Sequence, residues 1–155
     1  MTPAINLAKK HNIAHALHEY AHAASCESYG LEAAEKLGVD AARVFKTLVV
    51  SLDNTTLAVG VVPVSSQLNM KRMAKASGAR KAVMAQQADV ERATGYVLGG
   101  VSPLGQKKKL ATVIDASANG FDTIYVSAGR RGLEIELSPN DLCSLVNGRF
   151  ADIAC

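Results

Sequence analysis

Two neighbouring apolar stretches, residues 43–52 and 55–62, constrain the fold of this chain more than any other feature. The first reads RVFKTLVVSL, with β-branched and apolar side chains on both faces, as in a strand that is covered on both sides. Asp53-Asn54 fits a two-residue turn, so the second stretch is expected to return beside the first as a hairpin. We therefore place the first strand at the centre of a sheet.

Helices and further strands are predicted on both sides of this hairpin. Capping residues, proline at the first helical position and closing glycines predict helices over residues 2–10, 28–38, 69–77, 85–94 and 138–148. Apolar or alternating runs predict strands over 14–20, 112–115, 123–127, 133–137 (half-exposed) and 150–154, and a strand that ends over 96–98. This order predicts one domain, residues 1–155, of the α+β class, with a mixed, mainly antiparallel sheet and peripheral helices.

Lys46 is out of place in the predicted central strand. It shares a face with Leu48 and Val50, where a lysine has no packing reason to stand. A buried ammonium needs an anion, a hydrogen-bonding partner or a lowered pKa. The side chain could also extend its charge to the edge of the sheet. We favour a functional Lys46, because departures from a local pattern tend to mark sites.

Residues 96–109 (YVLGGVSPLGQKKK) combine a double glycine, a proline and three lysines in a row. Glycine lets the backbone approach a ligand closely and turn successive N–H groups toward one space. Pro103 stiffens the loop, and the lysines form too dense a cluster of charge to face a core. Rigid donors beside cations suit an anionic or carbonyl-bearing ligand, although a surface turn with a solvated charged run fits the same residues.

The formal net charge of +3 is unevenly distributed along the chain. Residues 71–131 hold 11 basic and 4 acidic side chains, a local charge of +7, and the segments on either side are acidic overall. Such a modest basic stretch fits one end of a nucleic acid better than a long duplex. Serial base stacking is disfavoured, because the chain has no tryptophan and only 3 phenylalanines and 4 tyrosines.

The sequence argues against a metal site. His11, His15, His18 and His22 are spaced as on one helix face, but transition-metal sites seldom use four histidines from one helix. The break at Asn12-Ile13 also favours a strand beyond it, in which His15 and His18 would point to opposite faces.

Other chemistries are disfavoured by what the sequence lacks. It has no Gly-x-Ser-x-Gly elbow, no P-loop and no dinucleotide fingerprint. An odd number of cysteines, 3, without Cys-x-x-Cys spacing argues against a disulfide framework or a zinc site. With neither a secretory signal pattern nor an apolar run of membrane-spanning length, we expect a cytoplasmic protein that does not enter a membrane.

Several motifs together make the chain resemble a known family. They are VFKTL at residues 44–48, GGVSPLGQKK at 99–108, IYVS at 124–127 and RGL at 131–133. Over essentially its whole length the chain resembles the YbaK family of bacterial Cys-tRNA(Pro) deacylases, which are related to the editing domain inserted in bacterial prolyl-tRNA synthetase. The resemblance implies a barrel-like sheet, a free-standing editing activity without metal or cofactor, and two partners: the acceptor end of aminoacyl-tRNA(Pro) and prolyl-tRNA synthetase.

The resemblance also implies roles for residues that match the family's motifs. Lys46 matches an essential lysine, and the glycine loop matches a Gly-x-x-x-Pro loop at the substrate carbonyl. Tyr29 stands where phenylalanine is usual, and Glu134 where aspartate is usual, so the role of this longer acid is open. The implied catalytic residues are Lys46, Gly99, Gly100, Val101 and Ser102, and the implied substrate-binding residues are Tyr20, Tyr29, Thr47, Pro103, Ser127 and Glu134.

The resemblance implies a reaction within the substrate, in which the cysteinyl sulfur attacks its own ester carbonyl. An intramolecular attack of this kind needs orientation rather than a protein nucleophile. We expect backbone N–H groups from Gly100 to Ser102 to hold the oxyanion, and Lys46 to anchor the terminal phosphate or the aminoacyl group. The acceptor stem is expected to contact the basic residues Lys71, Arg72, Arg80, Lys81, Lys107, Lys108 and Lys109.

Two rival functions remain open at this point. An Ala-tRNA(Pro) deacylase of the same fold differs in pocket size, which the sequence does not give. A non-catalytic tRNA-binding module would need neither Lys46 nor an intact glycine loop, and both are present. If no protein nucleophile acts, Cys26→Ala, Cys143→Ala and Cys155→Ala should each retain activity.

Overall fold

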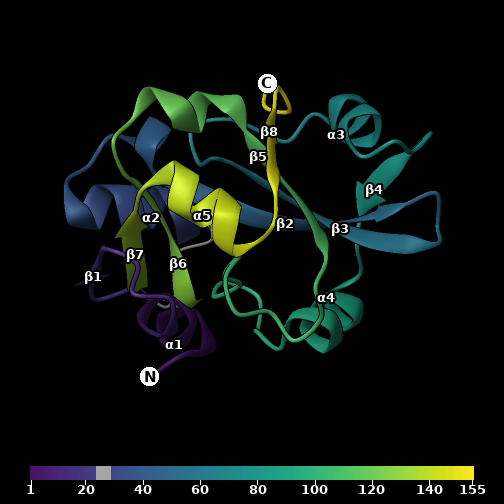
Figure 1. The fold of residues 1–155 in the computed structure, drawn as a ribbon. Coiled ribbons are helices and arrows are strands. Elements are labelled where there is room, and N and C mark those ends of the chain that lie inside the picture. Colours follow the sequence, from purple (N-terminus) through teal and green to yellow (C-terminus); the bar gives the residue numbers. More distant parts are fainter. Residues whose placement is uncertain (24–28) are drawn as a thin grey trace.

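The structure, a computed structural model, describes residues 1–23 and 29–155, and the strands of that part form two sheets with helices around them (Figure 1). Cys26 and Ser28, the expected start of the second helix, lie outside the described residues. The α+β class and the mixed, mainly antiparallel strand arrangement are confirmed.

The larger sheet is built around the predicted hairpin. Its strands are β2 (Phe45–Leu52), β3 (Thr56–Pro63), β4 (Ala82–Met84), β5 (Ala111–Asp115) and β8 (Arg149–Ala151), in the order β4-β2-β3-β5-β8. β2 pairs antiparallel with β3 and β4, whereas β3 with β5 and β5 with β8 are parallel. The hairpin and the inner position of β2 are confirmed. β4 escaped prediction because a three-residue strand is too short to show a periodicity.

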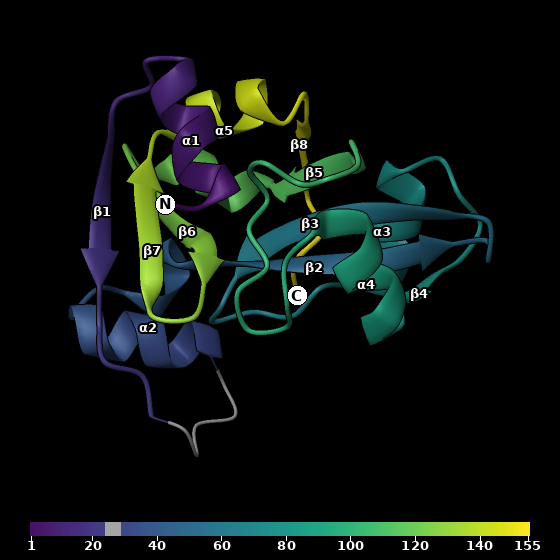
Figure 2. The same ribbon diagram turned by 90° about the horizontal axis from the view of Figure 1, so that it is seen from below.

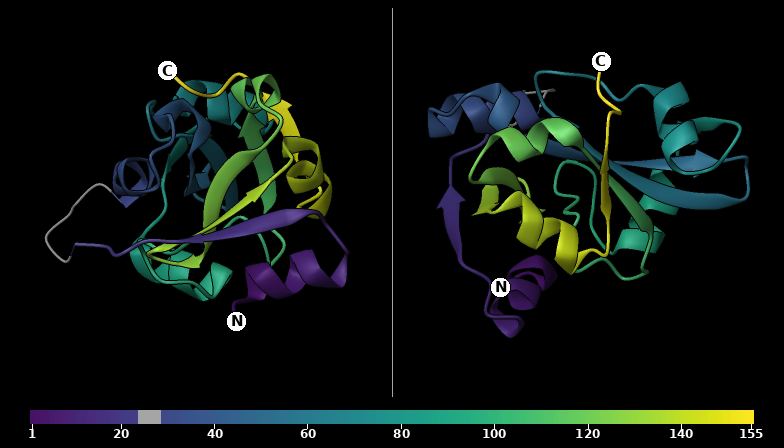
Figure 3. Two further views of the ribbon diagram at one scale, coloured as in Figure 1. Left: turned by 90° about the vertical axis from the view of Figure 1, so that its left-hand side faces the viewer. Right: turned by 45° about the horizontal axis from the view of Figure 1, so that its top comes forward.

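The smaller sheet is antiparallel and lies at one end of the molecule, while the β2–β3 hairpin reaches toward the other end (Figure 2). Its strands are β1 (His15–Glu19), β6 (Ile124–Arg130) and β7 (Leu133–Leu137), in the order β1-β7-β6. Figure 3 shows β1, in purple, as the outer strand. A parallel bridge between Val44 and Tyr125 joins the residue before β2 to β6, so the two sheets meet there.

Short helices surround the sheets: α1 (Pro3–Lys10), α2 (Tyr29–Leu37), α3 (Met70–Ala76), α4 (Gln87–Thr94) and α5 (Pro139–Leu145), with 3₁₀ turns η1 (Ala41–Arg43) and η2 (Ala116–Gly120). The predicted N-caps Thr2 and Ser138 are confirmed, because each side chain accepts a hydrogen bond from a first-turn N–H. Asn69 caps α3 in the same way. Figure 1 shows α3 and α4 beside the far end of the hairpin.

One apolar core holds the two sheets together. Phe45 and Val59 of the larger sheet belong to the same buried cluster as Ile124 and Ile135 of the smaller sheet and Leu142 of α5. A shared core fixes the relative position of the two sheets, and therefore of any site between them. Among the described residues, none of the helices has the length and hydropathy that a membrane-spanning segment requires.

Two local expectations are wrong. Residues 96–98 form no strand, because Gly95 ends α4 with φ 80° and the chain passes directly into the glycine loop. β7 is not half-exposed: Glu134 is only 6% exposed, and the leucine and isoleucine side chains of the strand are buried as well. The alternation in β7 separates an apolar buried face from a polar enclosed face, a distinction that the sequence pattern alone does not carry.

Candidate functional site

A cleft of about 360 Å³ opens where the two sheets meet. It brings together eight residues that the sequence singles out: Tyr20, Tyr29, Lys46, Thr47, Gly99, Val101, Ser127 and Glu134. Sequence reasoning missed four more lining residues, Gly30, Phe45, Leu48 and Leu98. Their adjacency to Tyr29, Lys46 and Gly99 was the available signal, because an apolar residue in a strand or loop has no chemical mark of its own.

The cleft has one wall from each sheet. Lys46 and Thr47 lie at the start of β2. Ser127 and Glu134 are paired neighbours on β6 and β7, so their side chains share one face of the smaller sheet. Tyr20 follows β1, where its N–H donates to the main-chain oxygen of Gly132 at 3.0 Å. The site therefore depends on the contact between the two sheets.

Lys46 lies in this cleft and not at a sheet edge. The side chain is half-buried, and burial lowers the pKa of its ammonium group. It makes no ion pair with any residue in 1–23 or 29–155. A cation that has lost part of its hydration without gaining a carboxylate favours the binding of an anion or a carbonyl oxygen.

Glu134 is the second ionisable group of the cleft. Glu134 is 6% exposed, and burial raises the pKa of its carboxyl group from 4.5 to about 8. Burial, and the nearby carboxylate of Glu134, also raise the pKa of the Tyr20 hydroxyl to about 12. At neutral pH both groups hold their protons, so this wall offers two O–H donors to a ligand.

We expect Glu134→Gln to remove a pH dependence of stability. Between pH 4.5 and 8 the folded protein keeps a proton on Glu134 that the unfolded chain has lost, so the free energy of unfolding of the wild type falls as pH rises. The difference in free energy of unfolding, variant minus wild type, should therefore rise by about 2 kcal/mol or more from pH 5 to pH 8, since one pKa unit corresponds to about 1.4 kcal/mol. Denaturant unfolding at both pH values measures this, with Glu35→Gln, at an exposed position of α2, as the control.

The glycine loop supplies main-chain groups to the cleft. Gly99, with φ 88°, and Val101 line it, whereas Gly100, Ser102 and Pro103 do not. The N–H of Gly100 donates to the oxygen of Val97 at 3.0 Å and is therefore engaged within the loop. No acceptor among the described residues engages the N–H groups of Val101 and Ser102. Of these two residues only Val101 lines the cleft, so its N–H group is the candidate donor that remains.

Gly100 has a different role, in packing. A Cβ at this position would lie 2.7 Å from Cα of Arg130 and 3.1 Å from the nitrogen of Arg131. Behind it, Ser102 is fully buried, and its hydroxyl oxygen accepts a hydrogen bond from the N–H of Leu104 at 3.2 Å. The loop is thus pressed against the turn between β6 and β7, which gives its N–H groups a fixed direction.

Tyr29 covers the loop at the mouth of the cleft. Its ring carbons lie 3.2–3.4 Å from the position of a Cβ on Gly99, and the guanidinium of Arg131 lies 4.4 Å from its ring centroid. Arg131 in turn forms an ion pair with the buried Glu32 at 3.1 Å. In the sequence, Arg131 stands out only as part of the RGL motif. Its place beside Tyr29 depends on a contact between residues about a hundred positions apart.

The predicted tRNA-binding residues fall into two exposed groups. Lys107, Lys108 and Lys109 follow the glycine loop directly. The main-chain oxygen of Lys81 accepts a hydrogen bond from the N–H of Asp53, which directly follows β2 and comes seven residues after Lys46. At about 3.3 Å per residue, Lys81 therefore lies about 23 Å from Lys46.

The second group comprises Lys71, Arg72, Arg80 and Lys81. Within it, Arg72 is already engaged, because its guanidinium donates to the oxygen of Ala154 at 2.7 Å and pairs with Asp152.

Among the residues that the structure describes, no cluster of histidine, cysteine and carboxylate side chains could hold a metal ion.

Comparisons with known proteins give this arrangement a context. Residues 24–145 match the family model of the aminoacyl-tRNA editing domain. The chain is 41% identical to the Enterococcus faecalis protein EbsC, which is provisionally named a Cys-tRNA(Pro)/Cys-tRNA(Cys) deacylase; the alignment covers 98% of this chain and 92% of EbsC.

Solved structures share the fold. The crystal structure of the hypothetical protein APE2540 has a TM-score of 0.86 and 25% identity, covering 99% of both chains. A structure provisionally described as a trans-editing enzyme for prolyl-tRNA synthetase has a TM-score of 0.83 and 20% identity, covering 98% of this chain and 92% of that one. The second likeness shows the fold alone.

Proposed function

The chain belongs to the family of aminoacyl-tRNA editing domains, and from this we propose that it is a trans-editing deacylase that removes cysteine from mischarged tRNA(Pro). The observation that carries the proposal is the cleft itself, where Lys46, a cation without an ion pair among the described residues, lies with the main chain of the glycine loop. The name of EbsC supports cysteine as the amino acid.

The cleft suits an attack by the substrate's own thiol. The sulfur forms a bond to the ester carbonyl carbon, the bond from that carbon to the ribose oxygen breaks, and the thiol proton ends on the ribose hydroxyl. The products are a cyclic thiolactone and uncharged tRNA. Because nucleophile and carbonyl belong to one molecule, the protein contributes mainly orientation and charge stabilisation.

Each wall has a part in this proposal. The N–H group of Val101 stabilises the developing oxyanion, and Gly100 holds it in place by packing. Lys46 binds the phosphate of the terminal adenosine or the aminoacyl group. Glu134, protonated at neutral pH, donates a hydrogen bond to the substrate from the opposite sheet.

Outside the cleft, the proposal extends to tRNA and to a protein partner. Lys107, Lys108 and Lys109, which follow the loop, contact the phosphates of the acceptor stem with little readout of sequence. Lys71 and Lys81, in the second group, also contact phosphates of the stem. Prolyl-tRNA synthetase, which charges tRNA(Pro), is the partner from which the mischarged substrate comes.

Deacylation of Cys-tRNA(Pro) and Ala-tRNA(Pro), with tRNA binding measured in parallel, tests this function. Rapid loss of the cysteinyl ester alone supports the proposal. Preferential loss of the alanyl ester would replace it with the alanine-editing activity of the same fold. Binding without loss of either ester would replace it with the tRNA-binding module.

Cysteine variants test the absence of a protein nucleophile. Cys143 and Cys155 do not line the cleft, so Cys143→Ala and Cys155→Ala should each keep kcat/KM within about twofold of the wild type. Cys26 lies outside the described residues, and Cys26→Ala is expected to behave in the same way. A folded but inactive single variant, by circular dichroism and deacylation, would contradict the mechanism.

A further inference from the structure

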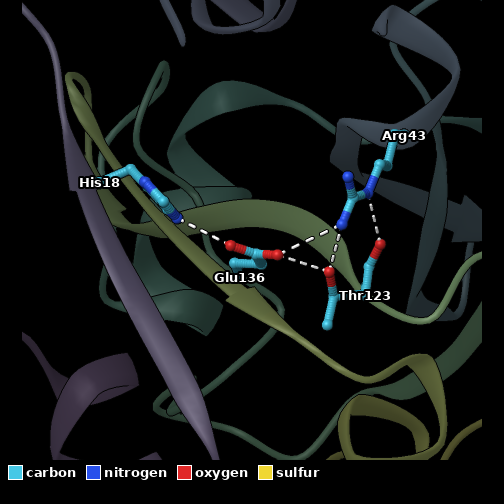
Figure 4. A network of polar contacts seen from close by, with 4 residues as sticks. All are labelled: His18, Arg43, Thr123 and Glu136. Atoms are coloured by element: carbon cyan, nitrogen blue, oxygen red, sulfur yellow. Dashed lines mark hydrogen bonds and ion pairs between the residues drawn. The ribbon is translucent and has the colours of Figure 1, made fainter. Parts of the chain in front are cut away.

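Glu136 on β7 holds two elements that carry cleft residues, although it does not line the cleft itself (Figure 4). Its Oε1 accepts a hydrogen bond from Nε2 of His18 on β1 at 2.9 Å. Its Oε2 accepts one from the hydroxyl of Thr123 at 2.5 Å and pairs with the guanidinium of Arg43 at 3.2 Å. One oxygen of the carboxylate thus binds β1 of the smaller sheet, and the other binds Thr123, directly before β6, and Arg43, which leads into β2 of the larger sheet.

The Arg43 side of this network is held by several contacts. Nε of Arg43 donates to the main-chain oxygen of Thr123 at 2.8 Å, and its NH2 group also donates to the Thr123 hydroxyl. The guanidinium lies 5.2 Å from the ring centroid of Tyr125, and the His18 ring lies 5.2 Å from the same centroid. The four polar residues and this ring thus pack as one unit.

The network lies immediately before both walls of the cleft. His18 is two residues before Tyr20, so the two side chains are on the same side of that strand. Arg43 is three residues before Lys46 and ends η1, which leads into β2. A change in the distance between His18 and Arg43 would therefore change the distance between Tyr20 and Lys46, on the two walls of the cleft.

Charge favours this arrangement. The Thr123 hydroxyl, and then His18 and Arg43, hold the pKa of Glu136 below its usual range against the opposing effect of burial. Glu136 is therefore a carboxylate at neutral pH, an acceptor for all three partners at once. Side chains exposed by 21–32% gain little stability from each contact, so the main effect of the network is on geometry.

We propose that Glu136 is a positioning residue that fixes the separation of the two cleft walls by tying His18 to Arg43. It acts through these partners and does not contact the substrate. The kinetic part of this inference rests on the proposed deacylase function. His18 and Arg43 are connected only through Glu136, since no hydrogen bond or ion pair joins them directly among the described residues.

A double-mutant cycle tests the tie on turnover of Cys-tRNA(Pro). His18→Ala and Arg43→Met should each lower kcat/KM about fivefold to tenfold, because either change breaks the tie. The kcat/KM of the double variant should be no more than about twofold below that of the less active single variant, because either single change already disconnects His18 from Arg43. Losses that multiply, or single variants within twofold of the wild type, would overturn the inference.

Amide hydrogen exchange in the protein without substrate gives a readout that needs no activity. Glu136→Gln should speed exchange about fivefold or more at one reporter for each wall. The reporters are the N–H of Tyr20, bonded to Gly132, and the N–H of Val64, which donates to the oxygen of Val44 at 2.8 Å. Glu35→Gln, on the exposed side of α2, is the matched control.

The two measurements separate this inference from the function on which it rests. Faster exchange at both reporters, with an unchanged control, supports the tie even if the wild type does not deacylate. Faster exchange at one reporter or at neither overturns it. A wild type that leaves Cys-tRNA(Pro) intact contradicts the proposed function alone.

Discussion

Lys46→Met is expected to lower kcat/KM for Cys-tRNA(Pro) about a hundredfold or more and to leave the fold intact. Methionine keeps most of the length of the side chain but removes a cation that has no ion pair within residues 1–23 and 29–155. Loss of one member of a desolvated charged contact costs about 2–5 kcal/mol, and about 1.4 kcal/mol corresponds to a tenfold change in rate. Stability should not fall, because burial already disfavours the charged ammonium.

Lys36→Met, at an exposed position of α2, is the matched control and should keep kcat/KM within about twofold of the wild type. Deacylation rates and thermal unfolding of both variants and the wild type make the comparison. An active Lys46→Met variant would remove Lys46 from the site. An inactive one that has also unfolded would assign Lys46 to the core.

Gly100→Ala should combine lost stability with lost activity. The new Cβ would lie 2.7 Å from Cα of Arg130, a main-chain atom that cannot rotate away. Overpacking of this kind costs about 1–3 kcal/mol, or roughly 2–12 °C in melting temperature for a domain of this size. The loop can relieve the clash only by moving away from the turn at Arg130, and the N–H group of Val101 would move with it. We therefore expect kcat/KM to fall about tenfold or more.

Gly120→Ala is the control for this substitution, because no atom lies within 4 Å of a Cβ at that position. Its melting temperature and activity should match the wild type. If Gly100→Ala melts at a lower temperature but keeps its activity, the loop does not position groups that matter for the reaction.

The sequence was informative where a residue breaks a local pattern. Lys46 stands out in an apolar strand, and its position in the cleft agrees with that signal. The hairpin and two helix caps could also be predicted, because turns and caps depend on residues a few positions apart.

Where contacts join distant residues, the sequence misled or gave no signal. Gly99 and Gly100 look equivalent, yet one lines the cleft and the other packs on the turn at Arg130. Glu134 and Glu136 alternate with apolar residues as solvent-facing side chains do, but Glu134 is buried in the cleft and Glu136 binds His18, Thr123 and Arg43. Alternation reports that two faces differ, not what covers each of them.

The most direct test of the central claim exchanges one atom of the substrate, sulfur for oxygen. Single-turnover deacylation of Cys-tRNA(Pro) and Ser-tRNA(Pro) by the wild type compares two esters of nearly the same shape that differ in nucleophilicity. If the substrate's thiol attacks within this cleft, the cysteinyl ester should be lost about a hundredfold faster than the seryl ester. Equal rates for the two esters would mean that water or a protein group attacks, and would contradict the account.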